Sequence, residues 1–71
     1  MNGKVLRILD QKGFGFIEGS DGVEYFFHRQ DYVGNFNDLV LAMRGQNTVD
    51  VTFDIAPSQK GPRAANVFLD T

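Results

Sequence analysis

One stretch of the chain alternates apolar and polar residues without interruption, and this pattern limits the structures that it can form. In Val49-Asp-Val-Thr-Phe-Asp-Ile55 every second residue is apolar, so Val49, Val51, Phe53 and Ile55 share one face of an extended strand. The two aspartates and the threonine take the opposite face. The pattern predicts a strand with one buried and one solvated side, which needs a sheet and a core on its buried side.

Four further segments have the composition of strands and are separated by turn residues. Aromatic and branched residues dominate them, and glycine, proline, serine and aspartate lie between them. The five predicted strands span residues 4–9, 14–18, 24–28, 49–55 and 64–69. Residues 29–47 are expected to form a long loop, in which Leu39-Val-Leu-Ala-Met43 is either one helical turn or a short strand extension. We therefore predict an all-β fold, a small closed barrel occupying residues 1–71 as a single domain.

The composition argues against several classes of function. The chain has 71 residues with no cysteine and a single histidine, so we expect neither a disulfide nor a zinc site, and no other metal or cofactor. No apolar run is long enough to span a membrane, and the first residues lack an apolar signal region. We therefore expect a cytoplasmic protein without a membrane or small-molecule partner. The carboxylates are scattered and His28 has no nucleophile at a catalytic spacing, so we do not expect an enzyme.

The stretch Lys12-Gly-Phe-Gly-Phe-Ile17 raises the question of which side of the barrel its phenylalanines face. Phe14 and Phe16 share one face of their strand, and Phe26 shares a face with His28 on the next strand. A histidine is a poor choice for a small apolar core, because its ring nitrogens need polar partners there. We therefore predict that these four residues point outward. The predicted interior consists of Val5, Ile17, Tyr25, Phe27, Val51, Phe53, Ile55 and Val67.

An exposed cluster of three phenylalanines and a histidine indicates a ligand with flat faces, because such a cluster is costly in water. Nucleobases are such ligands, since every base offers a π-face to an aromatic ring. Gly13 and Gly15 are interpreted as keeping the strand slim, so that a ligand can approach the backbone. The net charge is −2, but most basic residues lie in or beside the segments that carry the aromatics. These basic residues are Lys4, Arg7, Lys12, Arg29, Lys60 and Arg63.

Three motifs, in order along the chain, resemble the bacterial cold-shock protein family. KGFGFI (residues 12–17) and YFFH (residues 25–28) are similar to the paired ribonucleoprotein motifs of that family, and GPRAANV (residues 61–67) resembles its last loop and strand. The resemblance extends over essentially the whole chain and implies a five-stranded antiparallel barrel of the OB type. It also implies binding of single-stranded RNA or DNA with weak sequence preference, often as an RNA chaperone or in the regulation of gene expression.

The resemblance implies a role for individual residues. It assigns base stacking to the four residues predicted to point outward, and contact with the nucleic-acid backbone to Lys12. Phe36 corresponds to a further aromatic residue of the family, and either touches a base or covers the end of the barrel. Lys60 and Arg63 are expected to contact phosphates.

Two parts of the sequence depart from the family pattern. Leu6-Arg7-Ile8 stands where the family commonly has lysine, tryptophan and phenylalanine, and Arg29 stands where it has an aromatic residue after the histidine. A guanidinium plane stacks on a base and adds charge. We therefore predict that Arg7 and Arg29 contact the ligand.

A second hypothesis assigns the same aromatic surface to protein interaction or homodimerisation. The long connection at residues 29–47 would permit strand exchange between copies of the chain. On either hypothesis we expect a monomer or a weak homodimer, and the preference between RNA and DNA stays open.

Overall fold

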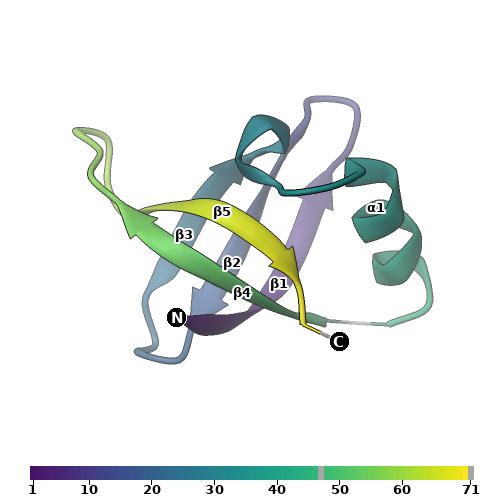
Figure 1. Ribbon diagram of the computed structural model, residues 1–71, viewed down its shortest axis with the longest axis horizontal. Coiled ribbons are helices and arrows are strands. Elements are labelled where there is room, and N and C mark those ends of the chain that lie inside the picture. Colours follow the sequence, from purple (N-terminus) through teal and green to yellow (C-terminus); the bar gives the residue numbers. More distant parts are fainter. Residues whose placement is uncertain (47, 71) are drawn as a thin grey trace.

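Five β-strands curl into a closed barrel in the computed structural model, which describes residues 1–46 and 48–70 (Figure 1). The strands are β1 (Asn2–Leu9), β2 (Phe14–Gly19), β3 (Glu24–His28), β4 (Val49–Ala56) and β5 (Arg63–Leu69). A 3-10 helix, η1 (Arg29–Asp31), and an α-helix, α1 (Phe36–Arg44), lie between β3 and β4. The prediction of a small all-β barrel is confirmed.

The strands follow the order β1-β2-β3-β5-β4 around the barrel, and one neighbouring pair is parallel. β3 and β5 run in the same direction and meet where Phe26 lies opposite Arg63, whereas the other pairs are antiparallel. The predicted five-stranded barrel is therefore present, but it is mixed rather than purely antiparallel. The reason is geometrical, because strands that alternate in direction around a closed ring must be even in number. A ring of five strands needs a parallel pair.

The barrel interior holds the residues that the alternation predicts, with one exception. Seven of the eight predicted interior residues are buried, but Ile55 is 55% exposed. β4 pairs with β1 only from Val49 to Thr52, so beyond Phe53 it has β5 as its sole neighbouring strand. Figure 1 shows this end of β4 and the start of β5 extending past the other strands. The prediction for Ile55 is wrong because the alternation continues after the barrel wall has ended.

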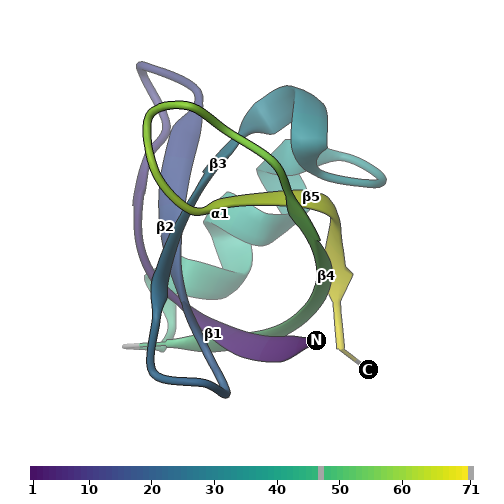
Figure 2. The ribbon, with the colours of Figure 1, turned by 90° about the vertical axis from the view of Figure 1, so that its left-hand side faces the viewer.

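The connection between β3 and β4 contains more helix than the sequence predicts. The expected loop at residues 29–47 holds η1 and the nine residues of α1, while its last residue, Asn47, lies outside the described residues. The side chain of Asn35 caps α1, accepting a hydrogen bond from the backbone N–H of Asn37 at 3.0 Å. An asparagine that suggests a loop thus starts a helix. α1 lies across one end of the barrel (Figure 2). Its Leu39 is completely buried.

Gly15 is required by the core rather than by a ligand. A Cβ atom at this position would lie 2.9 Å from the carbonyl oxygen of Arg7 and 2.9 Å from the ring of Phe27. Gly15 therefore faces the interior, where Phe27 fills the space that a side chain would need. The interpretation of Gly15 as an opening for a ligand is wrong, because the outward phenylalanines occupy the opposite face of the strand.

We expect Gly15→Ala to lower the free energy of unfolding by about 1–3 kcal/mol, the usual cost of overpacking a filled core. Urea unfolding followed by circular dichroism measures the change. Gly45→Ala is the matched control, because nothing lies within 4 Å of its Cβ position and its φ of −97° is open to alanine. This control should leave the free energy of unfolding unchanged or raise it by up to about 1 kcal/mol, because alanine restricts the unfolded chain. Wild-type stability of the Gly15→Ala variant would contradict the assignment.

The turn between β2 and β3 carries a hydrogen bond that links two titrating groups. The hydroxyl of Tyr25 donates to Oδ2 of Asp21 at 2.6 Å. This hydrogen bond lowers the pKa of the Asp21 carboxyl and raises the pKa of the Tyr25 hydroxyl. The folded state therefore favours an ionised Asp21 beside a neutral Tyr25.

The pKa shift of Asp21 predicts a specific loss of stability in acid. Because this pKa is lowered by folding, its contribution is present above the usual aspartate pKa and is lost as the pH falls through the lowered value. Tyr25→Phe removes the donor, so its Tm should fall less than the wild-type Tm on acidification. Thermal melts from about pH 7 down to about pH 2 test this. Parallel Tm profiles for the two proteins would contradict the linkage.

Candidate nucleic-acid interface

Three phenylalanine rings and a histidine lie side by side on the outer surface of β2 and β3. The strand register places Phe14 opposite His28 and Phe16 opposite Phe26. The ring centroid of Phe14 is 5.9 Å from that of Phe16 and 5.4 Å from that of Phe26, and the last two are 6.0 Å apart. Phe26 is exposed and the other three residues are half-buried. The structure thus brings the four predicted residues together, and they form the aromatic face.

Arg7 extends the aromatic face onto β1, because a β-bulge turns its side chain outward. Val5 pairs with Ile17 and Arg7 pairs with Phe16, so Leu6 is an additional residue on β1. Strict alternation from the buried Val5 would point Arg7 into the core, and the bulge reverses this direction. The guanidinium carbon of Arg7 lies 4.6 Å from the centroid of the Phe16 ring, in a cation–π contact.

Lys12 and Arg29 lie next to the end of the aromatic face at which β2 begins and β3 ends. Both side chains are exposed. Between Lys12 and β2, Gly13 has a φ of 74°, a left-handed conformation that favours glycine. The backbone N–H of Arg29 donates to the carbonyl of Gly13 at 2.7 Å, and a Cβ on Gly13 would lie 2.8 Å from Cδ of Arg29. The left-handed φ accounts for glycine at position 13, and its interpretation as an opening for a ligand stays a prediction.

A groove of about 300 Å³ borders the aromatic face where β3 meets β5. Two of its walls are the rings of Phe16 and Phe26, and the loop between β4 and β5 supplies the rest together with the first residue of β5. Lys60 and Arg63 both line this groove. The structure thus brings these two predicted basic residues to the aromatic face.

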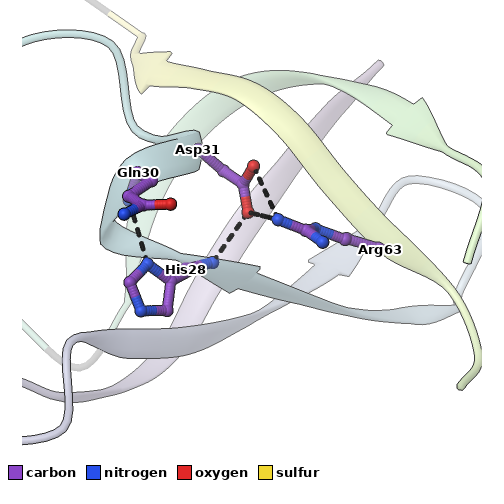
Figure 3. A network of polar contacts seen from close by, with 4 residues as sticks. All are labelled: His28, Gln30, Asp31 and Arg63. Carbon is purple, nitrogen blue, oxygen red and sulfur yellow. Dashed lines mark hydrogen bonds and ion pairs between the residues drawn. The ribbon is translucent and has the colours of Figure 1, made fainter.

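Arg63 is held in place by Asp31, a residue that sequence reasoning missed. Nε and Nη2 of Arg63 donate to both oxygens of the Asp31 carboxylate at 3.0–3.2 Å (Figure 3). The same carboxylate accepts the backbone N–H of His28 at 2.9 Å. The side chain of Asp31 is 13% exposed and that of Arg63 is 42% exposed. This Asp31 clamp ties the end of β3 to the start of β5 and compensates the charge of Arg63 within the protein.

The ring of His28 has a defined arrangement of donor and acceptor. Its Nδ1 accepts the backbone N–H of Gln30 at 3.2 Å, which caps η1 (Figure 3). A neutral imidazole has one donor and one acceptor nitrogen. The neutral His28 ring therefore carries its hydrogen on Nε2, which is the nitrogen that can donate to a ligand.

Phe36 lies outside the aromatic face, at the start of α1. Its ring centroid is 6.4 Å from that of Phe27 and 6.2 Å from that of Tyr32, and both of these residues are buried. The structure thus places Phe36 against the end of the barrel, which is one of the two positions that the sequence allowed. Contact between Phe36 and a base stays a prediction.

Basic side chains outnumber acidic ones around the aromatic face, where the acidic residues are Asp10 and Asp31. The Asp31 clamp is the one salt bridge found among residues 1–46 and 48–70. A different cavity is lined by Glu18, Asp50 and Asp70, and Lys4 lies with them rather than at the aromatic face. Four basic residues around the aromatic face form no salt bridge with any described residue. They are Arg7, Lys12, Arg29 and Lys60.

Rings and cations are the functional groups that this surface offers. Within the described part of the chain, no cluster of three or more acidic or histidine side chains could hold a metal ion. No helix there is long and apolar enough to cross a membrane. The aromatic face is thus suited to stacking and ion pairing.

Comparisons with known proteins agree with this fold. The family model of the 'Cold-shock' DNA-binding domain matches residues 1–69. The chain is 44% identical over 70 residues to cold shock-like protein CspC of Buchnera aphidicola subsp. Acyrthosiphon pisum, a match that covers 96% of this chain and 93% of that protein. It is 41% identical over 68 residues to cold shock-like protein CspB of Bacillus cereus, covering 94% and 95%. The corresponding match to CspC of Shigella flexneri is also 41% over 68 residues, covering 94% and 91%.

A small barrel of the OB type with aromatic rings on two adjacent strands belongs to a class of domains that bind oligonucleotides or oligosaccharides. Within that class, the family model that matches residues 1–69 identifies the family. The chain belongs to the cold-shock domain family, and the resemblance seen in its sequence motifs is confirmed.

We expect Asp31→Ala to lower the free energy of unfolding by about 1–2 kcal/mol. This value lies between the small contribution of exposed ion pairs and the large one of buried pairs. Asp54→Ala is the matched control, because Asp54 accepts an exposed hydrogen bond from the side chain of Asn66 at 3.1 Å. The control should cost less than about 0.5 kcal/mol in urea unfolding. Equal stability of the two variants would show that the Asp31 clamp does not hold the barrel.

Proposed function

We propose that this protein binds single-stranded RNA or DNA with low sequence specificity, by stacking unpaired bases on the aromatic face. The observation that carries the proposal is the cluster of three phenylalanine rings, with centroids 5.4–6.0 Å apart, on the outside of the barrel. Such a cluster is costly in water unless a ligand covers it. Membership of a family whose model is a DNA-binding domain supports nucleic acid as that ligand.

Stacking accounts for both the preference for single strands and the low specificity. A duplex covers the faces of its bases, whereas a single strand can present them to a protein. Every base has a π-face, so phenylalanine rings discriminate poorly among bases. Each stacked base contributes roughly 1–3 kcal/mol, and three or four platforms give micromolar or tighter binding after the costs of association. We expect a site of about 4–7 nucleotides.

Cations around the rings serve the phosphate backbone. Arg7 adds a guanidinium plane above Phe16, and the exposed Lys12, Arg29 and Lys60 are proposed to contact phosphates. No step in this binding is catalytic. A protein that holds bases unpaired disfavours RNA secondary structure, which is the action of an RNA chaperone and one route to the regulation of gene expression.

The proposal predicts that Phe26→Ala weakens binding to a pyrimidine-rich heptamer by about fivefold to 150-fold, which corresponds to the loss of one stacked base. Fluorescence anisotropy at low salt measures this affinity. Phe68→Ala is the matched control, because Phe68 is 45% exposed and lies at the end of β5 away from Arg63, where it pairs with Thr52 on β4. β4 is adjacent to neither β2 nor β3. This control should bind the heptamer like the wild type.

Three outcomes decide this test. Absence of wild-type binding at high micromolar protein would contradict the proposed function. An unchanged affinity of the Phe26→Ala variant would remove the aromatic face from it. A dimer that depends on protein concentration and is undisturbed by the oligonucleotide, seen by light scattering, would favour a protein-interaction module instead. Parallel NMR titrations with RNA and DNA heptamers of matched sequence then measure the sugar preference.

A further inference from the structure

A second groove, of about 400 Å³, lies between β1 and α1. Its apolar lining comes from Leu6 and Ile8 on β1 and from Val40 and Met43 on α1. Leu6 is the additional residue of the β1 bulge, and it is 38% exposed. The bulge that turns Arg7 toward the aromatic face thus also contributes an apolar side chain to this groove.

Arg7 connects the groove to the aromatic face. Its guanidinium carbon lies 4.6 Å from the Phe16 ring centroid, and the same residue lines the groove. A single strand that stacks on Phe16 and passes Arg7 therefore reaches the groove without leaving the protein surface. The two surfaces are continuous through one side chain.

The charges in the groove suit a nucleotide. Arg7 and Arg44 line it together with one carboxylate, that of Asp10, so cations are in excess. Both arginines are exposed, and neither forms a salt bridge with any residue that the structure describes. A guanidinium group matches the geometry of phosphate oxygens, while the apolar side chains of β1 and α1 match the face of a base. An apolar peptide would leave both guanidinium groups unused.

We propose that this groove is an additional subsite, which binds the nucleotide that continues the single strand beyond Phe16. The inference rests on the proposed function of the aromatic face. The base lies against the apolar side chains of β1 and α1, and its phosphate contacts Arg44. Asp10 opposes that phosphate and limits the affinity of the subsite. The protein then covers a longer strand than the aromatic face alone.

The test compares two lengths of pyrimidine-rich DNA, a hexamer that the aromatic face can hold and a nonamer that also reaches the groove. Arg44→Gln should weaken nonamer binding by about fivefold, as expected for one exposed ion pair. It should leave hexamer binding unchanged. The negative slope of log K against log salt should also become shallower by about 0.7 for the nonamer alone, because one phosphate contact is lost.

A variant of opposite sign sharpens the test. Asp10→Asn removes the opposing charge but keeps a side-chain oxygen for the backbone N–H of Gln11, which Asp10 accepts at 3.0 Å. It should strengthen nonamer binding and leave hexamer binding unchanged. Lys4→Gln is the control for loss of a positive charge, because Lys4 is exposed and lines a different cavity. This control should affect both lengths equally.

A longer strand can bind in more registers than a shorter one, which raises its apparent affinity. This increase is the same for every variant, so it cancels when variants are compared on the same oligonucleotide. Loss of affinity in Arg44→Gln that is equal for both lengths, or absent for both, would overturn the subsite and leave the proposed function intact. Wild-type protein that binds neither length would overturn the proposed function itself. NMR shifts of the Leu6 and Val40 methyl groups on addition of the nonamer, but not of the hexamer, would place the strand in the groove.

Discussion

The barrel closes where β3 meets β5, and this short contact brings Lys60 and Arg63 beside the aromatic face. The parallel pairing rests on the register of Phe26 with Arg63 and on a hydrogen bond from the backbone N–H of Phe26 to the carbonyl of Pro62 at 3.1 Å. The Asp31 clamp fastens the same junction from the side of η1. Phe26 therefore belongs both to the seam of the barrel and to the surface proposed to bind bases. A change that opens the seam therefore separates the aromatic face from Lys60 and Arg63, which line the groove beside it.

Local patterns predicted the strands and the aromatic face because both follow from the two-residue period of a β-strand. β2 shows why the inference worked. Phe14 and Phe16 occupy one side, and Gly15 on the other side leaves space for the Phe27 ring. The sequence could therefore indicate which residues face outward, although it suggested the wrong reason for the glycine. A neighbouring strand, rather than a ligand, takes the space.

The features that the sequence did not predict involve a break in periodicity or a partner distant in the chain. The bulge at Leu6 shifts the alternation of β1 by one residue, and the sequence contains no turn residue to mark it. Ile55 keeps the alternation after β4 has lost β1 as a neighbour. Asp31 and Arg63 are 32 residues apart, so their ion pair appears only once the barrel has closed. Each of these depends on tertiary pairing, which local composition does not encode.

The arginine at position 7 changes the balance of forces in the proposed interface. In the resemblance to cold-shock proteins this position corresponds to a tryptophan, which would provide apolar area, whereas Arg7 provides a cation stacked on Phe16. Stacking energy is nearly independent of salt, but contacts between guanidinium groups and phosphates weaken as counterions compete. The chain carries a net charge of −2, so this attraction is local to the basic surroundings of the aromatic face. On the proposed function, exchange of an aromatic platform for Arg7 makes binding depend more strongly on ionic strength.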